Sequence, residues 1–145
     1  MVGIALGFLD DLAAAKSSPK QKSQPVSVTV NGSLYELVFY RADGDVWAET
    51  VSRHPARGDS LIDRRYGYNF NAVVLEIAPK TGRVVEGDTD TEIPAESWAD
   101  LVPALSGAEI GRITDAIWAL NEWDPAQEIE RAKKALKAGS RRKSS

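Results

Sequence analysis

Hydrophobic residues recur most regularly near the C-terminal end of the chain, between Ser106 and Asn121. Their spacings of three and four place them on one face of an α-helix. Ser106 suits the N-cap and Glu109 stands three residues later, so the two predict a capping box. The residues of this apolar face, which are candidates for the core or for a binding groove, are Ile110, Ile113, Ile117, Trp118 and Leu120.

A second helix start follows within a few residues. Asp124 can cap a helix, Pro125 suits the first helical position, and Gln127 completes another capping box. The helical pattern then continues to about Ala138, where Gly139 is a natural stop. The two start signals predict two helices that form a helical hairpin, which the rest of the chain helps to bury.

Alternation of apolar and polar residues is clearest closer to the N-terminus. Valines alternate with serine and threonine in residues 26–30, and Asn31-Gly32 is a favoured two-residue turn. Residues 34–40 are rich in aromatic and branched side chains, so the pattern predicts a β-hairpin at 26–40. Because two strands alone are only marginally stable, helices or another chain must cover this hairpin.

Helix signals also occur between this hairpin and the C-terminal helices. Asp43 can cap a helix that ends before Pro55, and the charged residues 59–67 predict a loop or a short turn of helix. Pro94 opens another helix, which Pro103 kinks or shortens. The candidate core or groove residues on that helix are Trp98 and Leu101.

Residues 70–86 fit two alternatives. Apolar side chains at helical spacing over residues 70–77 predict a helix, capped by Asn69. The turn residues 79–82, followed by two valines, predict instead a strand pair. We favour the helix on periodicity, and we expect the polar residues 87–92 to form a loop.

Both ends of the chain stand apart from this body. Residues 1–16 predict an amphipathic helix, and residues 17–25, which are polar and contain two prolines, predict a flexible linker. The helix must therefore dock on the body, on a second copy or on a partner. Residues 139–145 predict a basic, disordered tail. The apolar positions of the N-terminal helix, a candidate interaction arm, are Ile4, Phe8 and Leu12.

Together these elements predict an α+β fold that is mostly α. An N-terminal β-hairpin is followed by a small helical domain ending in a helical hairpin, all within residues 26–138. Hydrophobic residues make up 43% of the 145, which is enough for a real core. The absence of cysteine excludes a disulfide framework and thiolate metal sites. We predict neither a signal peptide nor a membrane span, because acidic residues interrupt the N-terminal apolar run.

Charge is distributed unevenly along the chain. All 21 acidic residues lie in residues 1–130, whereas residues 131–145 hold seven of the 18 basic ones. A basic tail can bind nucleic acid, but it can also complement a helix C-terminus, and we favour the second interpretation. Arg64-Arg65 beside Tyr66 combines basic and aromatic side chains, as proteins that bind single-stranded nucleic acid do. The acidic body works against a phosphate backbone there, so nucleic acid is not an expected partner.

Candidate catalytic and metal-binding residues are few. His54 is the only histidine, and no nucleophile or orienting group accompanies it in the sequence. Asp88, Asp90 and Glu92 alternate as cation ligands can, but the central glycine and spacing of a calcium loop are absent. No glycine-rich phosphate motif occurs. The sequence therefore predicts a non-enzymatic protein without a metal or cofactor.

Five short segments stand out when the chain is taken in order. They are Val46-Trp47 to Ser52-Arg53-His54-Pro55, Gly67-Tyr68-Asn69, Glu96-Ser97-Trp98 with Leu101, Ile117-Trp118-Ala119-Leu120-Asn121, and the basic run Arg131 to Lys137. In this order they resemble segments of tail assembly chaperones of long-tailed phages that infect actinobacteria. The likeness covers roughly residues 26–137 and leaves out the N-terminal helix and the linker.

The resemblance implies a protein that coats the long tape measure protein, keeps it soluble and passes it to polymerising tail tube protein. Such chaperones act in the host cell cytoplasm, in a short form and a longer form made by programmed frameshifting, which would contact the tail tube. Apolar grooves and a charged exterior suit a long helical client. The N-terminal helix adds a route to self-association. The alternative function is a nucleic-acid-binding or head–tail adaptor protein of a phage.

Overall fold

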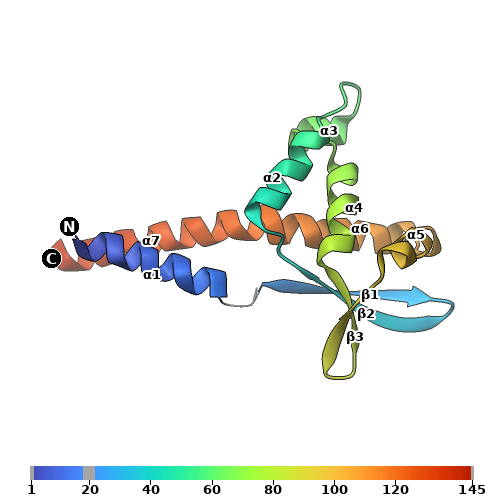
Figure 1. The fold of residues 1–145 in the computed structure, drawn as a ribbon. Helices are drawn as coiled ribbons and strands as arrows, with labels where there is room; N and C mark the ends of the chain where they lie inside the picture. Colours follow the sequence, from blue (N-terminus) through green and yellow to red (C-terminus); the bar gives the residue numbers. More distant parts are fainter. Residues whose placement is uncertain (1, 18–21, 145) are drawn as a thin grey trace.

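The computed structural model describes residues 2–17 and 22–144, and it is mostly helical with one four-stranded antiparallel sheet (Figure 1). The first half contains α1 (Val2–Ser17), β1 (Ser23–Val30), β2 (Ser33–Tyr40), α2 (Gly44–Arg53) and α3 (Leu61–Tyr66). The second half contains α4 (Phe70–Thr81), β3 (Gly82–Glu86), β4 (Thr89–Glu92), α5 (Ala95–Ala104), α6 (Gly107–Trp118), the π-helical η1 (Ala119–Trp123) and α7 (Asp124–Ser144).

The sheet has the strand order β1-β2-β3-β4, and α2, α3 and α4 are inserted between β2 and β3. β1 and β2 pair along their full length around Asn31 and Gly32, whose φ angles of 50° and 79° suit a tight hairpin turn. This hairpin covers the predicted residues 26–40 and begins earlier, at Ser23. The end of the predicted linker 17–25 is therefore strand, while residues 18–21 lie outside the described part of the chain.

Residues 70–92 combine both alternatives considered for 70–86. The predicted helix is α4, and it ends at Thr81, where the chain enters β3 directly. The prediction of a loop at 87–92 is wrong, because β4 pairs with β3 there through a turn at Gly87. An added Cβ at Gly82 would lie 2.7 Å from the rings of both Phe39 and Trp98. Glycine at this position thus allows the sheet and two helices to meet.

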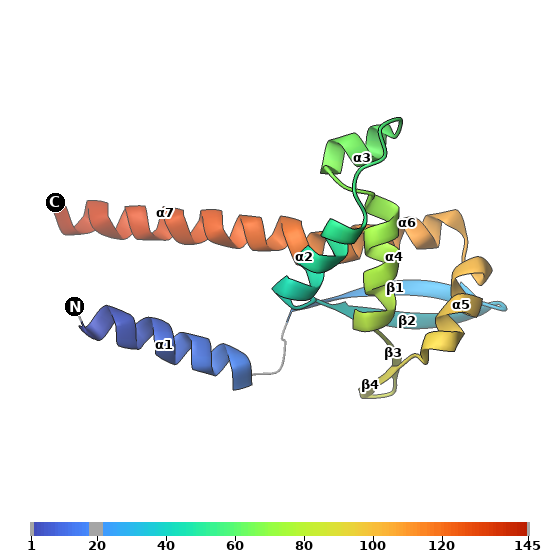
Figure 2. The same ribbon diagram turned by 45° about the horizontal axis from the view of Figure 1, so that its top comes forward.

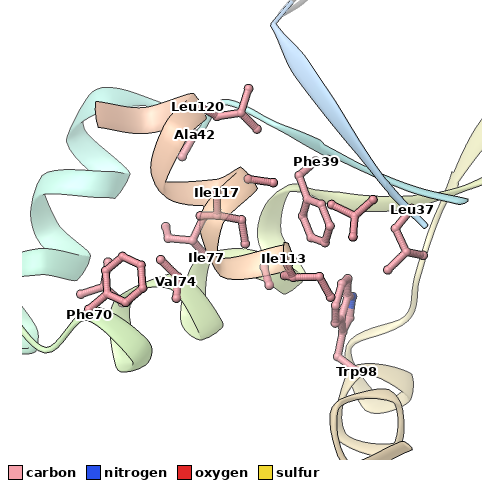
Figure 3. Packing of buried hydrophobic residues seen from close by; sticks show 14 of the residues in the cluster. Leu37, Phe39, Ala42, Phe70, Val74, Ile77, Trp98, Ile113, Ile117 and Leu120 are labelled. Carbon is pink, nitrogen blue, oxygen red and sulfur yellow. The ribbon is translucent and has the colours of Figure 1, made fainter. Parts of the chain in front are cut away.

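The core lies between one face of the sheet and the helices α4, α5 and α6 (Figure 3). Phe39 from β2, Ile77 from α4 and Ile117 from α6 are at most 1% exposed, and they meet near its centre. The strand residues reach it because alternate side chains of β1 and β2 point to the same face. The other described apolar side chains that are at most 2% exposed are Val28, Leu37, Val73, Val74, Ala78, Ile113 and Leu120.

The predicted helical hairpin at the C-terminal end is wrong. α6, η1 and α7 form one uninterrupted helical rod from Gly107 to Ser144 (Figures 1 and 2). The capping box of Ser106 and Glu109 is present at its start, as predicted. Asp124 has helical angles, φ −62° and ψ −45°, so it does not cap a new helix. The helix also passes Gly139, and residues 139–144 of the predicted disordered tail continue it.

A π-turn lets the rod pass Pro125 without a break. Proline has no N–H to donate to the preceding turn, and the wider turn leaves room for its ring. Arg41 supplies the missing donor, because its Nε donates to the carbonyl oxygen of Leu120 at 2.6 Å. Asn121 donates from Nδ2 to the carbonyl of Ile117 and accepts from the N–H of Ala42. Side chains thus donate to two carbonyls at the π-turn, and the one from Arg41 replaces the N–H that Pro125 lacks.

Candidate functional site: an apolar groove beside the sheet

An apolar groove of about 390 Å³ lies between the tip of the β1–β2 hairpin and α5. Val30 and Tyr35 line the groove near the hairpin turn, and α5 lines it from the other side. Val28 and Leu37 form its buried floor, whereas Tyr35 at the tip is 45% exposed. The remaining lining residues are Val30, Val84, Ile93, Ser97, Asp100, Leu101 and Ala104.

The rim of the groove carries little charge. Asp100 on α5 is the only charged side chain among the residues that line it, and Ser97 and Tyr35 add hydroxyl groups. The groove can therefore accept apolar side chains, with one carboxylate at the edge to orient a polar or basic neighbour. An apolar groove with a polar edge suits the apolar face of a helical segment.

Trp98 lies beneath this groove and belongs to the core. It is 3% exposed, and its ring centroid is 6.1 Å from that of Phe39. Its Nε1 has no hydrogen-bond partner among the residues that the structure describes. The neighbouring positions on α5, Ser97 and Leu101, face the groove. The helix thus uses one side to close the core and the adjacent side to line the groove.

The predicted groove candidates do not form one surface. Ile113, Ile117 and Leu120 are core residues, and Ile110 and Trp118 are half-buried at the edge of the core. Of the candidates, only Leu101 lines the groove. Trp98 lies on the same helix, α5, but its side chain belongs to the core. Sequence reasoning missed the strand residues that form the opposite wall, although the alternating valines of residues 26–30 place three side chains on that face.

The N-terminal candidates lie away from the groove. Phe8 and Leu12 of α1 are 66% and 48% exposed. The side chain of Ile4 lies outside the described part of the structure. No described helix is long and apolar enough to cross a membrane.

The basic and aromatic stretch from Arg64 to Phe70 is not an open stacking surface. Tyr66 stacks on Phe70 with centroids 4.2 Å apart, and it meets Trp118 edge-on at 5.5 Å. Tyr68 is buried and donates its hydroxyl hydrogen bond to Glu122, and burial raises the pKa of this tyrosine. These rings therefore join α3 and α4 to the C-terminal rod.

The charged residues of the α2–α4 region hold loops in place. Asp63 is fully buried and accepts hydrogen bonds from the backbone N–H and guanidinium of Arg57, which lower the pKa of its carboxyl. Glu76 contacts His54 at 2.8 Å and Arg53 at 3.0 Å, and these partners lower its pKa to about 2. Both carboxylates are thus ionised partners within the fold.

A second, polar cleft of about 720 Å³ lies on the other side of β3, and its charges are largely paired. Arg83 binds Asp90 at 2.6 Å, and Tyr40 donates to the same carboxylate. Across the described residues, no three His, Cys, Asp or Glu side chains are grouped as metal ligands. The apolar groove is therefore the better candidate for a binding site.

No family model, curated protein or solved structure matches the chain. Function is therefore inferred from the geometry and from the resemblance of the short segments.

Proposed function

We propose that this protein is a tail assembly chaperone that binds the tape measure protein through the groove between α5 and the β1–β2 hairpin. The observation that carries this proposal is an apolar groove formed by the helix with the Glu96-Ser97-Trp98 and Leu101 segment of the resemblance. The groove is thus a candidate surface for binding the tape measure protein. The body of the protein serves as a binding module and performs no reaction.

The size of the groove favours weak binding at each contact. Burial of one leucine-sized side chain contributes about 1.5–3 kcal/mol. A single contact of this strength is reversible, and a long client with many apolar positions can bind many copies of the protein. Such binding protects the client and still releases it when tail tube protein assembles around it. The action takes place in the host cell cytoplasm.

Co-expression with the tape measure protein tests this proposal. The protein should raise the soluble fraction of its client, and Leu101→Asp should abolish the gain, because a carboxylate in the groove opposes apolar contacts. Leu34→Asp is the matched control, since Leu34 is 74% exposed on the opposite face of the hairpin. The proposal fails if both variants, shown folded by thermal unfolding, solubilise the client equally well.

A frameshifted longer form is part of the same proposal. It would join this body to a second segment that recruits tail tube protein. The lysine pair Lys133-Lys134 lies close to the end of the chain, where A-rich codons can be slippery. The nucleotide sequence should contain an overlapping frame near this end, and junction peptides should be found in infected cells. A gene without any overlapping frame would remove the two-form mechanism.

Nucleic-acid binding, as expected of an adaptor protein, is the second candidate. The exposure of all side chains of α7 from Arg131 to Ala138 favours it, because basic residues there can reach phosphates from several sides. Binding should then weaken steeply with salt and should weaken further when residues 139–145 are removed. The chaperone function predicts no DNA binding at physiological salt.

A further inference from the structure

The outer part of α7 has an apolar strip that no described element covers. From Ile129 to Ala138 every side chain is exposed, including Ile129 at 56% and Leu136 at 75%. Ile129, Ala132 and Leu136 are spaced by three and four, so they share one face of the helix. Lys133 borders this strip. A narrow apolar strip with a basic border is the surface of a helix that pairs with another helix.

α1 has the complementary surface. Its described side chains from Gly7 to Lys16 are exposed, and Phe8 and Leu12 lie on one face at a spacing of four. Asp11 borders that face with a negative charge. The apolar positions therefore match those of α7, and the bordering charge has the opposite sign.

The first described residues after α1 lie beside the start of this strip. Lys22, where the described chain resumes after α1, forms an ion pair with Glu128 at 3.4 Å. Gln24 at the start of β1 donates to Asp124 at 3.3 Å. The connection from α1 therefore ends beside the residue that precedes Ile129. A short tether of this kind gives an effective concentration of about millimolar.

The direction and length of α1 also fit pairing with the outer part of α7. Figures 1 and 2 both show α1 on the same side of the body as the outer part of α7 and antiparallel to it, with the chain termini at the same end. α1 has 16 residues, and at about 1.5 Å per residue it is roughly as long as the part of α7 that follows Glu128.

We propose that α1 pairs with the Ile129–Leu136 face of α7 in the same chain, as an antiparallel helical pair that can open. Phe8 and Leu12 pack against the apolar strip, and Asp11 lies beside Lys133. When closed, the pair covers the apolar strip of both helices. When open, it offers this strip, with its basic border, to another helix. This device is separate from the groove and does not depend on the proposed function.

Engineered cysteines test the pairing in the full-length chain, which has no native cysteine. Leu12→Cys is combined with Ala132→Cys or with Leu136→Cys, so that two registers are sampled. The matched control combines Leu12→Cys with Lys134→Cys, which is equally tethered but lies on the opposite side of α7. Since a disulfide needs Cα atoms about 4.4–6.8 Å apart, one facing pair should oxidise within single chains several-fold faster than the control.

Three results of the oxidation assay would overturn the proposal. The first is equal oxidation rates in the facing and control variants, and the second is the absence of any intrachain disulfide. The third is a disulfide that joins two chains, because the occupant would then be a second copy. Charge reversal adds an independent measurement: Asp11→Lys should slow the facing disulfide, and Lys133→Glu in the same chain should restore it. Oxidation rates of the facing disulfide that are the same in these charge variants and in the parent chain would also contradict the pairing.

Discussion

Replacement of Arg41 by methionine should destabilise the protein by about 1–4 kcal/mol. The change removes the donor to the Leu120 carbonyl, and an acceptor left without a partner costs about 1–3 kcal/mol. It also removes the ion pair with Glu128 at 3.3 Å, which is partly exposed and adds about 0–1 kcal/mol. For a chain of this length the midpoint of thermal unfolding should fall by roughly 3–12 °C.

Urea unfolding, which gives the free energy directly, is the suitable assay, and Pro125→Ala provides the decisive comparison. Alanine restores a backbone N–H that can donate to the preceding turn, so Arg41→Met should cost less in that background than in the natural sequence. Lys22→Met is the control, since it removes the other, exposed partner of Glu128 and should change stability by less than about 0.5 kcal/mol. An equal cost of Arg41→Met in both backgrounds would refute our explanation of the π-turn.

Three further predictions concern the core and the acid response. Ile117→Ala should cost about 2–5 kcal/mol in urea unfolding, because the side chain is 1% exposed at the centre of the core. Gly82→Ala should cost about 1–3 kcal/mol by the same assay, because its Cβ would overlap two aromatic rings. Contacts with His54 and Arg53 lower the pKa of Glu76 from 4.5 to about 2. The stability that Glu76 provides is therefore complete above about pH 4.5 and lost as the pH falls towards about 2. In the Glu76→Gln variant, the free energy of unfolding should therefore fall less between about pH 4.5 and about pH 2 than in the natural protein. Urea unfolding curves measured at several pH values across that range test this.

The elements that the sequence predicts well are those determined by neighbouring residues. Asn31-Gly32 with its flanking alternation predicts the β1–β2 hairpin, and Ser106 with Glu109 predicts the start of α6. In each case the signal and the structure lie within a few residues of one another. The four residues of β4 are all polar and have no such signal. They form a strand because β3 supplies the pairing and Arg83 binds Asp90.

The error at Asp124 and Pro125 has a distant cause. The start signals there are real, but Arg41, far away in the sequence, supplies the donor that lets the helix continue. The groove was missed for a similar reason. One wall comes from Leu101 on α5 and the other from strand residues such as Val28, and only the folded structure brings the two walls together. Periodicity identifies the apolar face of each element, but it does not show which faces leave space between them.

A photoreactive group attached at a single cysteine in the groove tests the central claim most directly. Ala104→Cys places the group at the groove, and Leu34→Cys places it on the opposite face of the same hairpin. Each variant is purified, labelled at its cysteine, incubated with the tape measure protein, irradiated and examined by mass spectrometry. Our account predicts cross-links between the groove position and apolar segments of the tape measure protein, and few from the control position. Equal cross-linking from both positions, or none from the groove, would contradict it.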